Sequence, residues 1–143
     1  MVWIEWSQEY SVNIKQIDEQ HKKLINVINK LYDGLSGNSM ESFLSPANEI
    51  VNNAIAELAD YTRYHFSREE ELMRSNDYPD YLTHKSKHDD FVLKITEFQD
   101  SYREGHILVL AIEIIRFLRD WLINHILTID KQYTSFLNQR GVY

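Results

Sequence analysis

Apolar residues recur along the chain with the 3.6-residue period of amphipathic α-helices, in four segments separated by short polar stretches. Asp18 is expected to be the N-cap of the first segment, and Gly105 to stop the third. Ser45 and Pro46 open the second as an N-cap followed by proline at the first helical position. The predicted helices cover about residues 18–35, 46–74, 80–103 and 106–138. Helices joined by such short loops pack most simply as an antiparallel bundle, so the predicted fold is an all-α, up-down-up-down four-helix bundle.

The segment before the first helix, residues 1–17, contains Trp3, Trp6 and Tyr10. It is too aromatic to be a free tail, and we expect it to lie against the bundle as an N-terminal arm. The sequence contains no internal repeat, low-complexity stretch or linker. It therefore predicts one domain over residues 1–143, with the arm at 1–17 and the bundle at 18–138.

Composition excludes several classes of function. The formal net charge is −7 and no basic cluster stands out, so neither a nucleic acid nor an anionic membrane is an expected partner. The chain has no cysteine, which excludes disulfides, thiolate metal sites and thiol catalysis. The N-terminus "MVWIEWSQEY" lacks the features of a signal peptide, and no apolar run approaches the length of a membrane span. We expect a cytoplasmic protein without membrane insertion.

Histidines occupy positions on the apolar stripes of all four predicted helices. At a rise of about 1.5 Å per residue, their distances from the helix ends place them in one layer near one end of the bundle. A single histidine on an apolar face is usually a hydrogen-bonded core residue, and a pair four residues apart also occurs on surfaces. A layer of several histidines leaves many buried polar atoms to satisfy and favours a metal site. The residues of this layer are His21, His65, His84, His88 and His125.

Two carboxylates complete this set. Glu69 lies one helical turn beyond His65 and points at the same layer. Asp130 follows His125 by five residues, about 140° around a regular helix, so the aspartate must reach across or the helix must widen locally. Taken alone, Asp130 would be interpreted as a surface residue. The sequence "REEE" at 68–71 also contains Glu70 and Glu71, which we expect on a solvated face because they project away from Glu69.

Five imidazoles and two carboxylates are too many donors for one first-row metal ion. They fit two ions bridged by the carboxylates, with at least one open coordination position. Nitrogen and oxygen donors without sulfur suit iron, and also zinc, copper or manganese, so ligand type alone leaves the metal open.

The ordered pattern resembles the hemerythrin family. It consists of "QH" at 20–21, "HFSRE" at 65–69, "HKSKH" at 84–88 and "HILTID" at 125–130, and it spans the whole predicted bundle. The resemblance implies a non-haem di-iron centre in which Glu69, Asp130 and an oxo or hydroxo group bridge the two irons. One iron would be saturated and held by His84, His88 and His125. The other would keep an open position and be held by His21 and His65.

In that family dioxygen binds reversibly at the open iron, so the resemblance implies oxygen transport, storage or delivery. It also implies an apolar dioxygen pocket, although ordinary bundle core explains the same residues equally well. Delivery would require a recipient, for which an oxygen-consuming enzyme is a candidate partner. The pocket residues are Leu24, Phe66, Trp121, Leu122 and Ile126.

Other functions remain as alternatives: an oxygen or redox sensor, a di-iron peroxidase or oxidase, and a zinc or iron storage site. Di-iron oxidases built on four-helix bundles use four carboxylates and two Glu-x-x-His motifs. The centre predicted here has two carboxylates, and a less electron-rich centre favours reversible binding over O–O cleavage. The remaining histidine, His106, falls outside the predicted layer, and we expect it in an exposed loop.

Overall fold

The computed structural model describes residues 3–36, 49–103 and 107–143, and every regular element within these ranges is helical. Ser45, Pro46, Gly105 and His106 lie outside the described residues, so their predicted roles stay predictions. The helices are α1 (Lys15–Ser36), α3 (Glu49–Ser75), α4 (Tyr81–Arg103), α5 (Ile107–Asn124) and α6 (Lys131–Gln139), with a short 3-10 turn η1 (Gln8–Tyr10) and a π-helical segment η2 (His125–Asp130).

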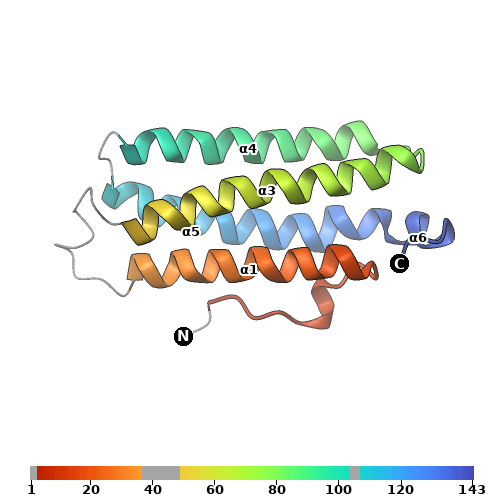
Figure 1. Ribbon diagram of the computed structural model, residues 1–143, viewed down its shortest axis with the longest axis horizontal. Helices are drawn as coiled ribbons and strands as arrows, with labels where there is room; N and C mark the ends of the chain where they lie inside the picture. The colour runs from red at the N-terminus through yellow and green to blue at the C-terminus, as the bar shows by residue number, and fades with distance from the viewer. Residues whose placement is uncertain (1–2, 37–48, 104–106) are drawn as a thin grey trace.

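The long helices α1, α3, α4 and α5 lie side by side along one axis (Figure 1). Each packs against the next in the chain, and α5 returns to contact α1, so consecutive helices are neighbours in space. This is the connectivity of an up-down-up-down bundle, and the predicted fold is confirmed.

Buried apolar side chains form two clusters that follow one another along the bundle. The larger one includes Leu24, Phe66 and Leu122. The smaller one includes Ile17 and Met73 near the end where α6 lies. On every helix that contributes to the histidine layer, the polar residues fall between members of the two clusters. The layer is therefore enclosed by apolar side chains on both sides.

The N-terminal arm packs along α1 (Figure 1). The Trp3 ring stacks on the Tyr32 ring with centroids 4.8 Å apart and planes 2° apart. The Ile4 N–H donates to Asn29 Oδ1 at 2.9 Å, and Asn29 Nδ2 donates back to the Ile4 carbonyl at 2.8 Å. These contacts agree with the expectation that the aromatic arm is not a free tail.

The start of the first helix differs from the prediction. It begins at Lys15, three residues before Asp18, so the interpretation of Asp18 as its N-cap is wrong. Asp18 instead accepts the Val12 N–H on Oδ1 at 2.8 Å and the Ser11 hydroxyl on Oδ2 at 2.6 Å. The carboxylate thus satisfies polar groups of the arm and fastens it to the first turn of the helix.

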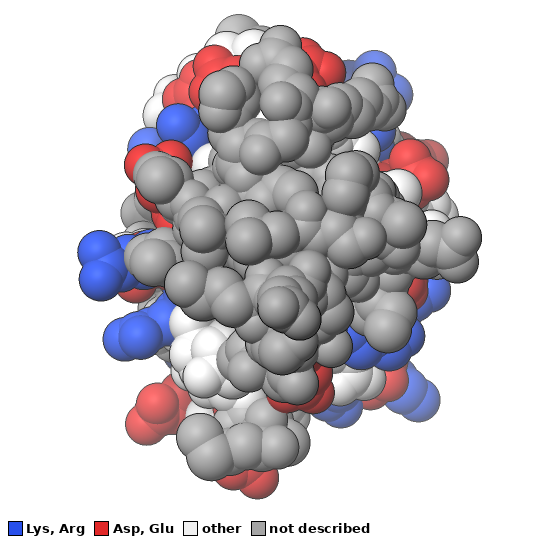
Figure 2. Space-filling view, turned by 90° about the vertical axis from the view of Figure 1, so that its left-hand side faces the viewer, with Lys and Arg blue, Asp and Glu red and all other residues white. Residues whose placement is uncertain are grey.

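The surface carries charges of both signs. Figure 2 views the end of the bundle opposite the histidine layer, and around its grey residues Lys and Arg alternate with Asp and Glu. Within the described ranges, no helix is long and apolar enough to cross a membrane.

Candidate metal centre

The structure brings all of the predicted ligands together in the core. His21 comes from α1, His65 and Glu69 from α3, His84 and His88 from α4, and His125 and Asp130 from η2. Each of these residues is at most 4% exposed. Their donor atoms fall into two groups, and Glu69 and Asp130 belong to both. One group adds His84, His88 and His125, and the other adds His21 and His65.

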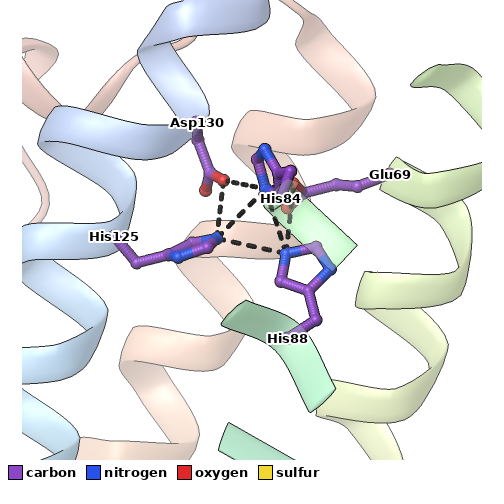
Figure 3. A group of neighbouring side chains, drawn as sticks. All are labelled: Glu69, His84, His88, His125 and Asp130. Carbon is purple, nitrogen blue, oxygen red and sulfur yellow. Dashed lines mark hydrogen bonds and ion pairs between the residues drawn. The ribbon is translucent and has the colours of Figure 1, made fainter. Parts of the chain in front are cut away.

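His84, His88 and His125 form a triangle of nitrogens (Figure 3). The three Nε2–Nε2 distances are 3.1, 3.1 and 3.2 Å. A neutral imidazole has a proton on only one nitrogen, so each Nε2 either donates or accepts. Among three such atoms at least two are of the same kind, and at least one pair cannot form a hydrogen bond. Nitrogens bound at right angles to one ion by bonds of about 2.1 Å lie about 3.0 Å apart, which matches this triangle.

The two carboxylates each present one oxygen to each histidine group. Asp130 Oδ1 lies 2.9 Å from His125 Nε2 and 3.0 Å from His84 Nε2, whereas Oδ2 lies 3.2 Å from His21 Nε2. Glu69 Oε1 contacts His65 Nε2 and lies 3.3 Å from His21 Nε2. Glu69 Oε2 faces the other group, 3.5 Å from His84 Nε2. This is the orientation that a carboxylate needs to bridge two cations.

The π-helical segment η2 explains how Asp130 reaches the centre. In a π-helix the backbone bonds join residues five apart, so His125 and Asp130 lie on successive turns. The Lys131 N–H accordingly bonds the Ile126 carbonyl, five residues back. The Thr128 hydroxyl donates to the Asn124 carbonyl at the start of the segment. The sequence left two possibilities: the aspartate reaches across, or the helix widens locally. The structure shows the local widening.

Several buried polar atoms of the centre make no hydrogen bond of normal geometry within the described residues, although the carboxylate oxygens lie close to imidazole nitrogens. They are His21 Nδ1, Glu69 Oε2, His88 Nδ1, both Asp130 oxygens and the Tyr133 hydroxyl. Burying a polar atom without a partner costs about 1–3 kcal/mol, so such a concentration is expensive in a natural core. Cations would satisfy the three carboxylate oxygens of this set, and the histidine and carboxylate donors fit first-row metal ions. The residues therefore fit a metal centre.

The electrostatics of the metal-free centre favour bound protons. Burial disfavours the charged form of His21 and of His84, but Asp130 and Glu69 outweigh it and raise both pKa values to about 9. Burial also opposes ionisation of Glu69, yet the neighbouring imidazoles, led by His65, hold its pKa well below the usual range. Burial lowers the pKa of His65 despite the charge of Glu69. Because ligating histidines must be neutral, metal binding displaces the protons on His21 and His84.

The metal-free protein is expected to lose stability as pH rises from about 6.5 to about 9. The folded pKa values of His21 and His84 lie above the value of 6.5 that applies to an unfolded histidine. Their stabilising contribution is therefore complete below pH 6.5 and is lost as pH rises through 9. Urea unfolding of the metal-free protein across this range should show the loss, amounting to a few kcal/mol. The iron-loaded protein is the control, and an equal loss in both forms would contradict the assignment.

Two residues next to the ligands were not predicted as part of the site. The His65 Nδ1–H donates to Gln20 Oε1 at 2.7 Å, which leaves the His65 Nε2 lone pair facing Glu69 and the centre. Glu70 was expected on a solvated face, but its side chain is only 17% exposed and its Oε2 lies 3.7 Å from His88 Nδ1. The interpretation of Glu70 is therefore wrong, because α4 covers the side of α3 to which Glu70 projects. Lys85 Nζ, also on α4, lies 3.9 Å from Glu70 Oε1.

Replacing Gln20 by alanine is expected to weaken metal binding about 10- to 100-fold, the usual effect of removing the hydrogen bond that orients a ligating histidine. Gln20 is 5% exposed and contributes its amide oxygen to this one ligand, His65. Competition with a chromogenic chelator would measure the affinity. Gln20→Glu retains an acceptor and should retain most of it. Equal affinity of the alanine variant and the wild type would remove Gln20 from the site.

The predicted pocket residues pack around the same layer. Phe66 stacks on His88 with centroids 3.8 Å apart, and Trp121 stacks on His125 at 4.3 Å. Leu24, Leu122 and Ile126 are at most 5% exposed and belong to the same core cluster as Phe66, against which Trp121 packs. Their position makes them part of the wall of the centre, while a role in dioxygen binding stays a prediction.

The sequence is similar to those of known proteins. Residues 12–137 match the hemerythrin HHE cation binding domain, a range that contains every proposed ligand. A bacteriohemerythrin of Methylococcus capsulatus is 33% identical over 139 residues, which cover 96% of this chain and 97% of that protein. A hemerythrin-like protein of Naegleria gruberi is 31% identical over 132 residues, covering 92% of each chain.

Solved structures agree at the level of the fold. A crystal structure of wild-type hemerythrin superposes with a TM-score of 0.80 at 31% identity, covering 94% of this chain and 98% of that chain. The similarity thus extends over the arm, the four-helix bundle and the residues of the centre.

Proposed function

Because the chain belongs to the hemerythrin family, we propose that it binds dioxygen reversibly at a non-haem di-iron centre held by the seven buried side chains of the two ligand groups. Non-haem di-iron oxygen binding is the function that this membership supports. His84, His88 and His125 would hold one iron, His21 and His65 would hold the other, and Glu69 and Asp130 would contribute oxygens to both.

The observation that carries this proposal is the unequal sharing of donors. The group with three histidines offers five donors in total, and the group with two histidines offers four, with both carboxylates counted in each. A metal ion in the first group would therefore have one more protein donor than an ion in the second, which would leave the freer position for an external ligand in the second group.

The residues of the chain perform distinct tasks in such a centre. When bound, two ferrous ions supply the electrons that dioxygen takes up and returns. The carboxylates of Glu69 and Asp130 would contribute oxygens to both ions and offset part of their charge. The apolar side chains of Leu24, Leu122 and Ile126 keep water away from the polar layer, which would slow autoxidation of the centre. Gln20 fixes the orientation of His65, a ligand on the open side.

Diffraction from crystals of iron-loaded protein tests the assignment of ligands. Data collected on either side of the iron absorption edge should show two anomalous peaks, one beside each histidine group and both next to Glu69 and Asp130. A single peak, or two peaks away from the carboxylates, would contradict it. Loading with zinc in parallel shows whether the site is built for iron alone.

A carrier role is proposed in preference to an enzyme. The centre has two carboxylates, and di-iron oxidases on four-helix bundles use four. A turnover assay with hydrogen peroxide and a phenolic dye would detect the alternative: sustained turnover at more than trace rates would favour a peroxidase. Delivery of oxygen to an oxygen-consuming enzyme and a cytoplasmic location also stay predictions, which cell fractionation and pull-down with the iron-loaded protein would test.

A further inference from the structure

A cleft of about 480 Å³ opens between α4 and α5 on the outside of the metal centre. Trp121 and Phe117 contribute aromatic surface to it, and His125 forms part of its lining. Lys87, Asp90 and Asp120 contribute charge. His125 is only 4% exposed, so the cleft reaches a proposed ligand without opening the centre itself to solvent.

Trp121 joins this cleft to the centre. Its ring lies parallel to the His125 ring, with centroids 4.3 Å apart and planes 11° apart. Phe91 holds the indole from another side, at a centroid distance of 4.3 Å. His125 in turn points its Nε2 into the triangle with His84 and His88 (Figure 3). The Trp121 indole therefore extends the lining of the cleft onto the ring of His125, a proposed metal ligand.

The cleft leads to the group of three histidines, away from the pair His21 and His65. The open position of the proposed centre lies on the side of that pair, so a ligand that must bind iron directly gains nothing from this route. An electron needs no open position, because it reaches the metal through a ligand ring. The location of the cleft thus favours electron transfer over a path for dioxygen.

A reversible oxygen carrier requires such a step. Ferrous iron in contact with dioxygen is gradually lost to the ferric state, and a ferric pair has no electrons to give to dioxygen. We propose that Trp121 and His125 form the path by which a one-electron donor with a cationic contact surface returns the oxidised centre to the ferrous state. The inference rests on the proposed function, since it needs the di-iron centre.

The chemistry balances without further reactants. Two donor molecules each lose one electron, and the two electrons convert two ferric ions to two ferrous ions. Uptake of solvent protons would offset the two negative charges that the centre gains. No covalent bond forms between the donor and the protein, so the donor needs only transient contact with the cleft.

Charge identifies the kind of donor. The lining contains two carboxylates, Asp90 and Asp120, and one cation, Lys87, so its net charge is negative, as is that of the whole chain at −7. The only ion pair found for these three residues within the described part of the chain joins Asp120 to the exposed Arg119 at 3.9 Å. Attraction between exposed charges at low ionic strength raises the rate of encounter with a cationic donor.

Stopped-flow reduction of the oxidised, iron-loaded protein tests the proposal. Hexaammineruthenium(II) serves as the cationic donor and dithionite as the anionic one. Trp121→Leu should slow reduction by the ruthenium complex several-fold, while Trp121→Phe, which retains a ring, should slow it less. Asp90→Asn and Asp120→Asn should each slow the cationic donor about two- to fivefold at low ionic strength and speed the anionic one. Asp60→Asn, on α3 and outside the cleft, is the control and should change neither rate.

Equal reduction rates in Trp121→Leu and the wild type would overturn the electron path. Equal reduction rates in the wild type, Asp90→Asn and Asp120→Asn would overturn the proposal of a cationic donor. A second measurement needs no iron: collisional quenching of indole fluorescence by caesium and by iodide in the metal-free protein. The difference between wild type and Trp121→Phe isolates Trp121, and caesium should quench it more strongly than iodide. An indole that neither ion quenches would show that the cleft is closed to donors. Failure of the wild type to retain iron would instead contradict the proposed function.

Discussion

Replacing Asp130 by alanine is expected to leave the protein unable to hold two iron ions. Each oxygen of Asp130 faces a different histidine group, Oδ1 toward His84 and His125 and Oδ2 toward His21. Removing the carboxylate deletes a donor from both groups and one of the two negative charges that offset a pair of cations. We expect metal affinity to fall at least about 100-fold. Loss of a residue that only hydrogen-bonds to a ligand already lowers metal affinity by about 10- to 100-fold. Iron analysis after gel filtration should find well under two irons per chain.

Asp89→Ala provides the matched control. Asp89 lies beside the ligand His88 in sequence, but its carboxylate points outward to Lys85 at 2.8 Å, and its side chain is 63% exposed. An exposed pair of this kind contributes little to stability. The control should therefore retain full iron loading. If Asp130→Ala also bound two irons, Asp130 would not be a bridging ligand.

Replacing Leu122 by alanine should have the second largest effect, on both stability and the lifetime of the oxygenated protein. Leu122 is 5% exposed in the larger core cluster and lies three residues before the ligand His125. The truncation removes apolar contacts and leaves a cavity, which costs about 2–5 kcal/mol of unfolding free energy in buried leucines. A cavity next to the centre also gives water a place close to the polar layer. We expect autoxidation, followed in the visible spectrum, to accelerate several-fold.

Leu118→Ala separates the two effects. Leu118 is fully buried one turn earlier in the same helix and belongs to the same cluster, farther from the ligand layer. It should lose a similar amount of stability without a comparable change in autoxidation. An equal acceleration in both variants would mean that general loosening of the core, and not the position of Leu122, controls the oxidation.

The histidine layer could be predicted because its residues follow the helical period. His21, His65, His84, His88 and His125 share the apolar stripes of their helices, so the antiparallel packing that buries those stripes also brings the imidazoles together. Glu69 follows from the same rule, since it lies one turn from His65. For these residues the 3.6-residue period of each helix and the packing of the bundle place the side chains in the same layer, so their positions could be predicted from the sequence.

Simple helical rules did not predict the surroundings of three acidic residues, each for a different physical reason: Asp130, Glu70 and Asp18. Asp130 reaches the centre through a π-helical turn, which a fixed period of 3.6 residues does not predict. Glu70 is covered by a neighbouring helix, so its surroundings depend on packing that its own sequence does not specify. Asp18 resembles a helix cap but bonds the arm, because the chain before it folds back within reach of its carboxylate.

The relation between the two ligand groups was likewise beyond the sequence pattern alone. The number and types of donors indicated two ions bridged by the carboxylates, and the assignment of each histidine to one ion came first from the family resemblance. The coordinates place one oxygen of each carboxylate toward each group. That detail depends on the rotamers of Glu69 and Asp130, which are set by the surrounding rings.

Reversible oxygen binding at a di-iron centre can be measured by anaerobic loading with ferrous iron, followed by an iron count and visible spectra through alternating oxygen and argon. We expect two irons per chain, one for each ligand group, and a colour that appears under oxygen and fades under argon over repeated cycles. Two irons that oxidise once, without a coloured form that reverses, would contradict reversible oxygen binding and favour an oxidase or a sensor.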